Sequence, residues 1–244
     1  MNSLNAFFHP GSIAIVGASP KTAIPARLTT MVIRHGYSGD VYPINPNYKE
    51  MFGLPAYPDL SSVPGRVDLA VVLVRAERVY SALEECAAKG VRAAVVFSSG
   101  FAETGEEGRK WQEQIKTLCE RTGIRVIGPN CLGLVSLGNR LVLTSSTFAD
   151  RIRGTETYPG ALLSQSGAIG TMICSDALRM GKTFRYFVST GNEMDVETGE
   201  LGTYLIEDPE IKVIGLYIES VKKPDQFRRL AQRAVELEKP LAVL

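Results

Sequence analysis

Short apolar runs rich in valine and isoleucine alternate with longer segments of helical period along most of this 244-residue chain. This alternation is typical of a parallel β-sheet with helices on its faces, because the strands of such a sheet are buried on both sides. The first strands that it predicts are residues 13–16, 41–44, 69–74, 93–97 and 125–127. The helices predicted between them lie near residues 25–35, 78–89 and 106–121. The chain is therefore expected to begin with an α/β unit of five strands.

A less regular stretch, residues 138–159, interrupts the alternation before it restarts. The elements predicted after it are strands at 161–163, 184–189, 213–218 and 240–244 and helices near 168–180, 201–206 and 225–238. These patterns predict two domains, residues 1–135 and 160–244, joined by a linker at 136–159. The final run PLAVL is typical of a buried strand but lacks the helix that should cover it, so the second domain is expected to be partial and the chain a fragment.

The composition indicates a globular protein with room for two cores. Hydrophobic residues make up 45% of the chain, charged residues 22%, and the net charge is +1. Neither nucleic acid nor a membrane surface is therefore an expected partner. The sequence has no signal peptide and no apolar run of membrane-spanning length, which predicts a cytoplasmic protein. The four cysteines are scattered without a C-x-x-C pair, so no metal site is expected.

The segment SIAIVGAS, residues 12–19, predicts a strand followed by a glycine turn of the kind that holds phosphate groups. A dinucleotide site needs G-x-G-x-x-G and an acidic residue about 20 positions later. Only Gly17 is in place, and the second strand ends in Asn45-Pro46 rather than in a carboxylate. An NAD-dependent dehydrogenase is therefore disfavoured. A plain strand-to-helix turn is the competing interpretation.

Polar residues follow each of the first five predicted strands, at the edge where open α/β sheets bind ligands. After the glycine turn these residues are Asn45, Lys49, Arg75, Ser99, Gly100 and Asn130. Lys49 and Arg75 suit an anionic ligand that carries phosphate, although isolated charges of this kind are also typical of a solvated surface. The pattern indicates a ligand crevice along this edge.

A second turn of the same kind follows the strand at 161–163. Ser166 and Gly167 precede a predicted helix, which suits an inorganic or transferring phosphate, with a simple helix cap as the alternative. A nucleophile elbow does not fit, because the G-x-S-x-G spacing is absent and both histidines precede the serine. Glu219 follows the strand at 213–218 and could orient a histidine ring, with a solvated glutamate as the alternative.

Seven motifs occur in one order along nearly the whole chain. They are SIAIVGAS, VYPINP, SSGFAETGEEG, IGPNCLG, LLSQSGAIG, STGNEMDV and LYIES. This order resembles the α part of the ADP-forming acyl-CoA synthetases, or acetate–CoA ligases, which are similar to the α subunit of succinyl-CoA synthetase. The resemblance implies an α/β protein with a Rossmann-like CoA-binding domain followed by a partial flavodoxin-like ligase domain.

The resemblance also implies roles for individual residues. The residues that would hold the CoA phosphates are Gly17, Ala18 and Ser19, and those that would line the path of CoA are Asn45, Arg75, Ser99, Gly100 and Asn130. Family members often have a lysine directly after the VNP segment, where this chain has Asn47, with Lys49 two residues on. Ser166 and Gly167 would bind phosphate. Glu219 matches the glutamate that steadies the family's phosphorylated histidine.

The reaction that the resemblance implies passes a phosphoryl group from ATP to a histidine and then to a carboxylic acid, after which CoA displaces phosphate from the acyl phosphate. That histidine is expected beyond residue 244, since His9 and His35 lie in unmatched contexts. ATP or ADP with magnesium is expected on an ATP-grasp β subunit or a fused domain. The alternative is a CoA-binding regulatory module of a larger protein, such as a lysine acetyltransferase.

Overall fold

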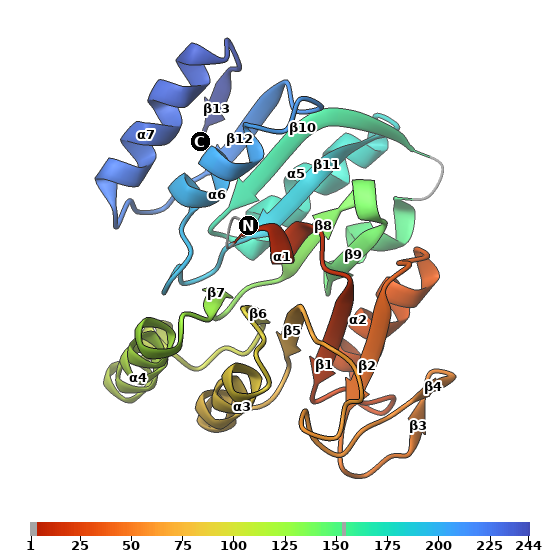
Figure 1. Ribbon diagram of the computed structural model, residues 1–244. Coiled ribbons are helices and arrows are strands. Elements are labelled where there is room, and N and C mark those ends of the chain that lie inside the picture. The colour runs from red at the N-terminus through yellow and green to blue at the C-terminus, as the bar shows by residue number, and fades with distance from the viewer. Residues whose placement is uncertain (1–3, 153–154) are drawn as a thin grey trace.

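The computed structural model describes residues 4–152 and 155–244, which fold around two large β-sheets that lie one above the other in Figure 1. Residues 1–3 of the predicted first domain and residues 153–154 of the predicted linker lie outside the described residues. None of the helices in these described ranges is long and apolar enough to cross a membrane.

The first sheet has five parallel strands in the order β2-β1-β5-β6-β7. Its strands are β1 (Ser12–Val16), β2 (Asp40–Ile44), β5 (Leu69–Val72), β6 (Ala93–Val96) and β7 (Arg125–Ile127). The remaining elements of this half are α2 (Ala23–Arg34), the hairpin β3 (Glu50–Met51) and β4 (Leu54–Pro55), α3 (Ala76–Ala88), η1 (Ala102–Thr104) and α4 (Glu106–Thr122). Every residue of β1, β5 and β6 is buried, as their apolar sequences predict for strands covered on both faces.

The second sheet has six strands in the order β13-β12-β10-β11-β8-β9. Its strands are β8 (Gly133–Ser136), β9 (Leu141–Thr144), β10 (Glu156–Ser164), β11 (Lys182–Ser189), β12 (Val213–Tyr217) and β13 (Leu241–Val243). Four of them, β10 to β13, are parallel, whereas β8 pairs antiparallel with both β11 and β9. The helices of this half are η2 (Leu137–Asn139), η3 (Thr147–Arg151), α5 (Gly167–Arg179), α6 (Thr198–Leu205) and α7 (Pro224–Glu236).

The segment predicted as an irregular linker, 136–159, is the main difference from the sequence-based expectation. It contains β9, η3 and the first residues of β10, and all four residues of β9 are buried. The run LVLT is too short to show a period of its own, and its burial comes from pairing with β8 and from packing against α2 of the other half. The expected irregularity was therefore wrong for these residues, while the linker and the domain boundaries remain predictions.

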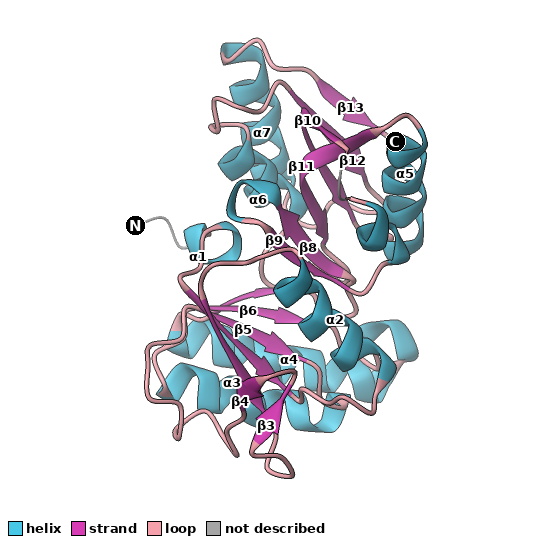
Figure 2. Cartoon of the chain, turned by 90° about the vertical axis from the view of Figure 1, so that its right-hand side faces the viewer, coloured by secondary structure: helices cyan, strands magenta, loops and turns pink. Residues whose placement is uncertain are grey.

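Three hydrophobic cores follow from this layering, and Figure 2 shows the helices on the two faces of each sheet. One core lies between the first sheet and the helices α3 and α4, and another lies between the second sheet and α5. The largest core continues from α2 and the other face of the first sheet into β8, β9, β10, α6 and α7. The short helix α1 (Asn5–Phe8) joins it, because Phe8 stacks on Tyr204 with ring centroids 5.4 Å apart. The two halves therefore share apolar contacts.

Each sheet has a point where successive connections leave in opposite directions. In the first sheet β1 is flanked by β2 on one side and β5 on the other, and in the second sheet β10 is flanked by β11 and β12. Ligands of open α/β sheets bind beyond the carboxyl ends of the strands at such switch points. The two expected sites therefore follow β1 and β10, where the sequence places its two glycine-containing turns.

Candidate functional site

The first turn, residues 17–19, lies at the switch point between β1 and β5. Gly17 has φ +86°, and a Cβ atom at this position would lie 3.1 Å from Val74 Cγ1 and 3.2 Å from the Leu73 carbonyl carbon. A side chain would therefore be both strained and crowded. The glycine is required so that the chain can leave β1 beside the end of β5.

Most of the N–H groups in this turn already have partners inside the protein. Gly17 N donates to the Ile44 carbonyl at 3.0 Å, and Ala18 N donates to the Ile15 carbonyl at 3.3 Å. Among the described residues, Ser19 N has no such partner, so this N–H group can still donate a hydrogen bond. Gly17 and Ala18 therefore shape the turn by their backbone conformation, and Ala18 is fully buried.

Side chains reinforce the same turn. Asn45 donates from Nδ2 to the Ala18 carbonyl at 2.8 Å, and its Oδ1 accepts from Asn47 N at 3.0 Å. Ser19 Oγ accepts from Lys21 N at 3.2 Å. Asn45 and Ser19, both predicted as ligand contacts, thus also hold the turn in shape. The Asn45 amide donates a hydrogen bond to the turn, whereas the carboxylate at the end of this strand in a dinucleotide fold accepts from the ribose hydroxyls.

Three cationic side chains extend from this edge of the first sheet into solvent. Lys49 follows β2, Arg75 is the residue before α3, and Lys21 lies directly after the turn. All three are exposed. Lys21 was not among the predicted contacts, although it lies only two residues after Ser19. Their charges favour an anionic ligand at this edge.

The turns after β6 and β7 complete the edge. Gly100 N donates to Glu103 Oε1 at 2.7 Å, and Asn130 N donates to the Ser98 carbonyl at 2.9 Å. Ser99 and Asn130 are exposed. The structure therefore brings all the residues predicted after the first five strands to one edge of the sheet.

The second turn lies at the start of α5. Ser166 is its N-cap, and Ser166 Oγ accepts from Ile169 N at 3.4 Å, so the predicted capping role is present. A Cβ atom on Gly167 would lie 2.7 Å from Leu132 Cδ1. Gly167 thus makes room for a side chain from the segment between the two sheets, a packing role that the sequence did not reveal.

Gln165 connects this turn to the loop after β12. Its Oε1 accepts from Glu219 N at 2.7 Å and from Ser220 N at 2.9 Å, and its Nε2 donates to the Ser220 carbonyl at 2.7 Å. Glu219 is exposed, and its carboxylate makes no hydrogen bond to another described residue. Ser166 and Glu219, predicted from separate motifs, therefore lie on neighbouring strand ends that one glutamine holds together.

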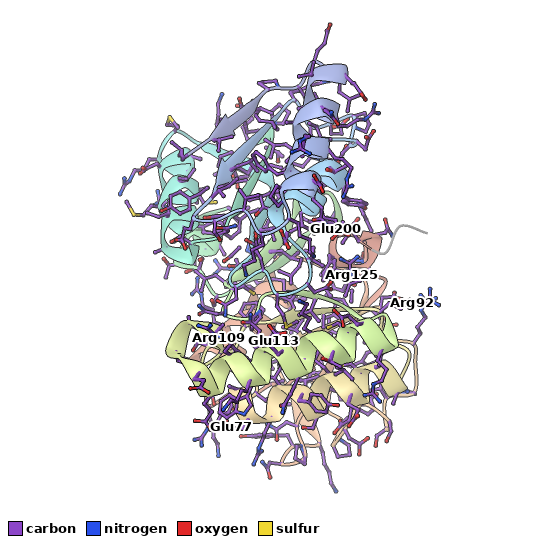
Figure 3. All side chains as sticks on the ribbon, turned by 90° about the vertical axis from the view of Figure 1, so that its left-hand side faces the viewer. Glu77, Arg92, Arg109, Glu113, Arg125 and Glu200 are labelled. Carbon is purple, nitrogen blue, oxygen red and sulfur yellow. The ribbon has the colours of Figure 1, made fainter. Side chains whose placement is uncertain are left out.

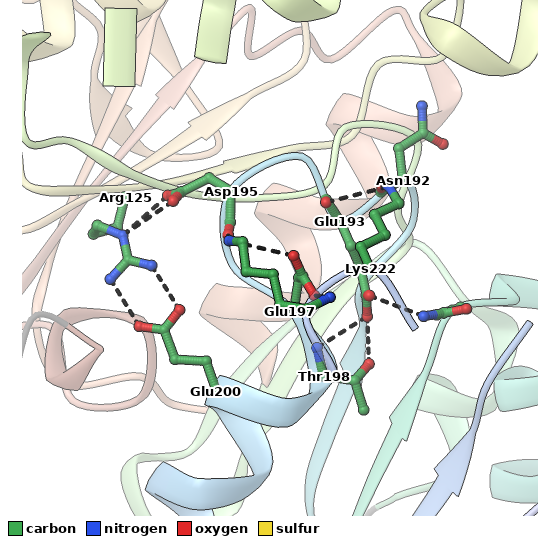
Figure 4. Close-up of polar contacts among 10 residues, drawn as sticks. Arg125, Asn192, Glu193, Asp195, Glu197, Thr198, Glu200 and Lys222 are labelled. Carbon is green, nitrogen blue, oxygen red and sulfur yellow. Dashed lines mark hydrogen bonds and ion pairs between the residues drawn. The ribbon is translucent and has the colours of Figure 1, made fainter. Parts of the chain in front are cut away.

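A buried carboxylate, that of Glu193, bonds to this arrangement, and Figure 4 shows it with Thr198 and Lys222. Glu193 is 3% exposed and accepts from Gln165 Nε2 at 2.8 Å, from Thr198 N at 3.0 Å and from Thr198 Oγ1. Lys222 Nζ donates to the Glu193 carbonyl at 3.3 Å. Because a carboxylate can only accept, Glu193 fixes which end of the Gln165 amide faces it. Neither Gln165 nor Glu193 was identified as a site residue from the sequence.

Ion pairs and hydrogen bonds join the two halves beside the site. Arg125 in β7 pairs with Asp195 at 3.0 Å and with Glu200 at 2.8 Å, and Figure 3 shows Arg125 and Glu200 together between the two halves. These bonds, with that to Glu200 the strongest, raise the pKa of the Arg125 guanidinium. Asn130 Nδ2 donates to Asn192 Oδ1 at 3.3 Å. The carboxyl edges of the two sheets therefore meet.

The histidines lie elsewhere. His9 follows α1 and its Nδ1 is 2.8 Å from Asn139 Nδ2, while His35 caps the carboxyl end of α2. A helix that follows a strand in a parallel sheet returns to the amino edge, so His35 lies at the edge opposite the site. Neither residue is placed to reach Glu219.

The cysteines are buried thiols, and the described acidic residues form no metal-holding group. All four cysteines are buried, and burial raises the pKa of the Cys86, Cys119 and Cys131 thiols to about 12. They therefore stay protonated at neutral pH and are poor nucleophiles. No group of three or more His, Cys, Asp or Glu side chains among the described residues could hold a metal ion.

The glycine turn at the switch point of the first sheet has the geometry of a phosphate-binding turn, and the chain lacks the acidic ribose residue of the dinucleotide enzymes. Residues 11–136, just over half of the chain, match the CoA binding domain family, and residues 159–244 match the succinyl-CoA ligase like flavodoxin domain. The chain belongs to the CoA binding domain family. The predicted order of a Rossmann-like CoA-binding part and a flavodoxin-like part is thus confirmed.

Named relatives match nearly the whole chain. It is 38% identical over 237 residues to acetate–CoA ligase [ADP-forming] I of Archaeoglobus fulgidus, covering 97% of this chain and 34% of the relative. It is 36% identical to the α subunit of acetate–CoA ligase [ADP-forming] II of Pyrococcus furiosus, covering 99% of this chain and 51% of the relative. The chain thus spans at most about half the length of these relatives, and the predicted resemblance to the α part of such ligases is confirmed.

A solved structure shares the arrangement of both sheets. The dinucleotide forming acetyl-coenzyme A synthetase 1 of Ca. Korarchaeum cryptofilum, in complex with phosphate and ADP, superposes with a TM-score of 0.90 at 34% identity. The match covers 100% of this chain and 52% of the other. The relative placement of the two halves is therefore similar to that in the synthetase.

Proposed function

We propose that this chain is the CoA-binding α portion of an ADP-forming acid–CoA ligase, which converts a carboxylic acid, ATP and CoA into acyl-CoA, ADP and phosphate. One observation carries the proposal. The turn at Gly17 lies at the carboxyl edge of the first sheet, and Ser166 and Glu219 lie at the carboxyl edge of the second sheet. These two edges meet at Asn130 and Asn192. A reaction between CoA and a phosphorylated intermediate needs both groups at one place.

The first edge would bind CoA. Ser19 N has no partner among the described residues and would donate to a phosphate, and Gly17 and Ala18 give the backbone its shape there. The cations nearby, Lys49, Arg75 and Lys21, would neutralise phosphate charge. Ser99, Gly100 and Asn130 would then line the path toward the second turn, and Asn45 would act through the turn that it holds.

The second edge would handle phosphate. Ser166 and Gly167 stand at the start of α5, where the free N–H groups of the helix favour an anion. The thiolate sulfur of CoA would attack the carbonyl carbon of an acyl phosphate, the carbon–oxygen bond to phosphate would break, and phosphate would leave with the bonding electron pair. The helix terminus would stabilise the charge on that leaving group.

Glu219 would orient the histidine that carries the phosphoryl group between ATP and the acid. His9 and His35 do not reach it, so we propose that this histidine comes from outside residues 1–244. ATP with magnesium would bind to an ATP-grasp β subunit or fused domain. We also propose a cytoplasmic location. The ligase is preferred to the regulatory module because the relatives reported above are named as ligases.

Calorimetric titration of CoA into this chain tests the proposal. We expect the parent to bind CoA and Gly17→Val to lower the affinity at least about tenfold, equivalent to about 1.4 kcal/mol. Gly90→Val is the matched control, since Gly90 has a similar φ of +84° but no atom within 4 Å of an added Cβ. It should bind CoA like the parent. A folded parent that does not bind CoA would refute the proposal.

A further inference from the structure

Asn192 uses its backbone and side chain to connect the two sheets. It lies in the loop between β11 and α6 of the second sheet, and its N–H donates to the Pro129 carbonyl at 2.9 Å. Its Nδ2 donates to Glu103 Oε2 at 2.6 Å and to Gln112 Oε1 at 2.9 Å. Its Oδ1 accepts from Asn130 Nδ2 at 3.3 Å. Within the described part of the chain, the side-chain hydrogen bonds of Asn192 are therefore all made with the first half.

One of these partners, Glu103, shapes the edge where CoA is proposed to bind. Glu103 Oε1 accepts from Gly100 N at 2.7 Å and from Phe101 N at 3.1 Å, which closes the turn after β6. Burial alone would raise the pKa of Glu103, but its hydrogen bonds, with that from Asn192 first, outweigh burial and lower it. The carboxylate thus stays charged while it holds the turn.

The neighbouring glycine keeps Asn192 at this position. A Cβ atom on Gly191 would lie 2.3 Å from the Pro129 carbonyl oxygen and 2.5 Å from the Asn130 carbonyl oxygen. Both atoms belong to the backbone and cannot rotate away as a side chain could. The loop of the second sheet is therefore pressed directly against the turn after β7, and Asn192 has little freedom to move.

We propose that Asn192 is a positioning residue for the CoA-binding edge: its amide, which belongs to the second sheet, sets the turn at Gly100 through Glu103 and holds Asn130 directly. This inference rests on the proposed function, because it assigns a role in the same CoA site. Nδ2 faces two acceptors at once, while Oδ1 faces a donor, so neither a carboxylate nor an apolar group can replace the amide.

The direct test is CoA affinity, measured by calorimetry, in Asn192→Ala and Asn192→Asp. We expect Asn192→Ala to weaken CoA binding about two- to tenfold, since the side-chain hydrogen bonds of Asn192 are partly exposed. Asn192→Asp should weaken it further, because two carboxylates would face each other across the former hydrogen bond. The control is Asn139→Ala, which removes an amide that bonds to Phe8 and His9 at a distance from this edge. It should leave CoA affinity unchanged.

A double variant and a titration separate positioning from a general loss of structure. Adding Glu103→Gln to Asn192→Asp restores a donor opposite an acceptor, and we expect it to recover most of the lost affinity. The pKa of Glu103, followed by carbon-13 NMR of its carboxyl group, should rise in Asn192→Ala and stay unchanged in Asn139→Ala.

The outcomes distinguish this inference from the proposed function. If the parent binds CoA and Asn192→Asp binds it equally well, the positioning role is refuted and the CoA site stands. If the double variant stays as weak as Asn192→Asp, or Asn139→Ala is equally weak, the effect is structural and the inference also fails. A parent that does not bind CoA refutes the proposed function itself. The Glu103 titration then still reports whether Asn192 controls this turn.

Discussion

Gly191→Ala should destabilise the protein far more than an ordinary glycine replacement. Gly191 has φ +60°, and the added Cβ would meet three backbone atoms between 2.3 and 2.8 Å, all of them in Pro129 and Asn130. Contacts this short require the backbone to shift. Gly181→Ala is the matched comparison within the same half, because Gly181 has φ +73° and no atom within 4 Å of an added Cβ.

The magnitude follows from the difference between the two sites. An alanine in left-handed conformation costs about 1–2 kcal/mol, and this strain is common to both variants. Overpacking against atoms that cannot rotate away adds about 1–3 kcal/mol, and only Gly191 incurs it. We therefore expect a loss of about 1 kcal/mol for Gly181→Ala and about 3 kcal/mol for Gly191→Ala.

Urea denaturation followed by circular dichroism measures both losses, and calorimetry with CoA adds a functional reading. Gly191→Ala should also weaken CoA binding, because relief of the clash moves Asn130 and Asn192 apart. Gly181→Ala should leave CoA binding unchanged. Equal losses of stability in the two variants would show that the close approach of the two sheets is not rigid, and the reasoning on Asn192 would lose its basis.

Two further predictions concern polar groups of the second half. Burial alone would raise the pKa of the Asp208 carboxyl, but bonds from Tyr186 OH and Glu210 N, together with the nearby Arg185, outweigh it and lower the pKa below its ordinary value of 3.8. The stability from this carboxylate is thus present above that value and is lost as the pH falls through the lower pKa of the folded state. Asp208→Asn should lower the free energy of unfolding by about 1 kcal/mol at pH 7. Urea denaturation should show that this difference between variant and parent shrinks below about pH 4. A difference that stays constant with pH would contradict the role of the Asp208 carboxylate. Gln165→Leu should speed hydrogen exchange of the Glu219 and Ser220 amides about tenfold, because both amides donate to Gln165 Oε1. The internal control is Ile218 N, which donates to the Leu244 carbonyl instead. Unchanged exchange at Glu219 would mean that Gln165 does not hold this loop.

The sequence predicted those parts of the candidate site that depend on residues adjacent in the chain. Gly17 and Ser166 were predicted because a strand, a small-residue turn and a helix start are adjacent in the chain. The parallel pattern then brought Asn45, Arg75 and Asn130 to one edge, because all carboxyl ends of a parallel sheet lie on the same side. Their contacts with CoA remain predictions.

The residues that were missed act through contacts that are distant in sequence. Gln165 bonds to a loop 54 residues away, and Asn192 bonds to Glu103 across 89 residues. β9 was expected to be irregular for the same reason, since three apolar residues and a threonine become a strand only through β8 and α2. No period or motif in the sequence marks such partners.

The sequence by itself determined the fold class, the two switch-point turns and the absence of a dinucleotide fingerprint, because each depends on neighbouring residues and on the spacing of apolar runs. Only the tertiary structure decided how the two edges meet. That geometry comes from the backbone contact at Gly191 and from the side-chain bonds of Asn192, Gln165 and Glu193. Such contacts form only after both sheets have packed, since their partners are brought together by the shared core rather than by the chain's local order.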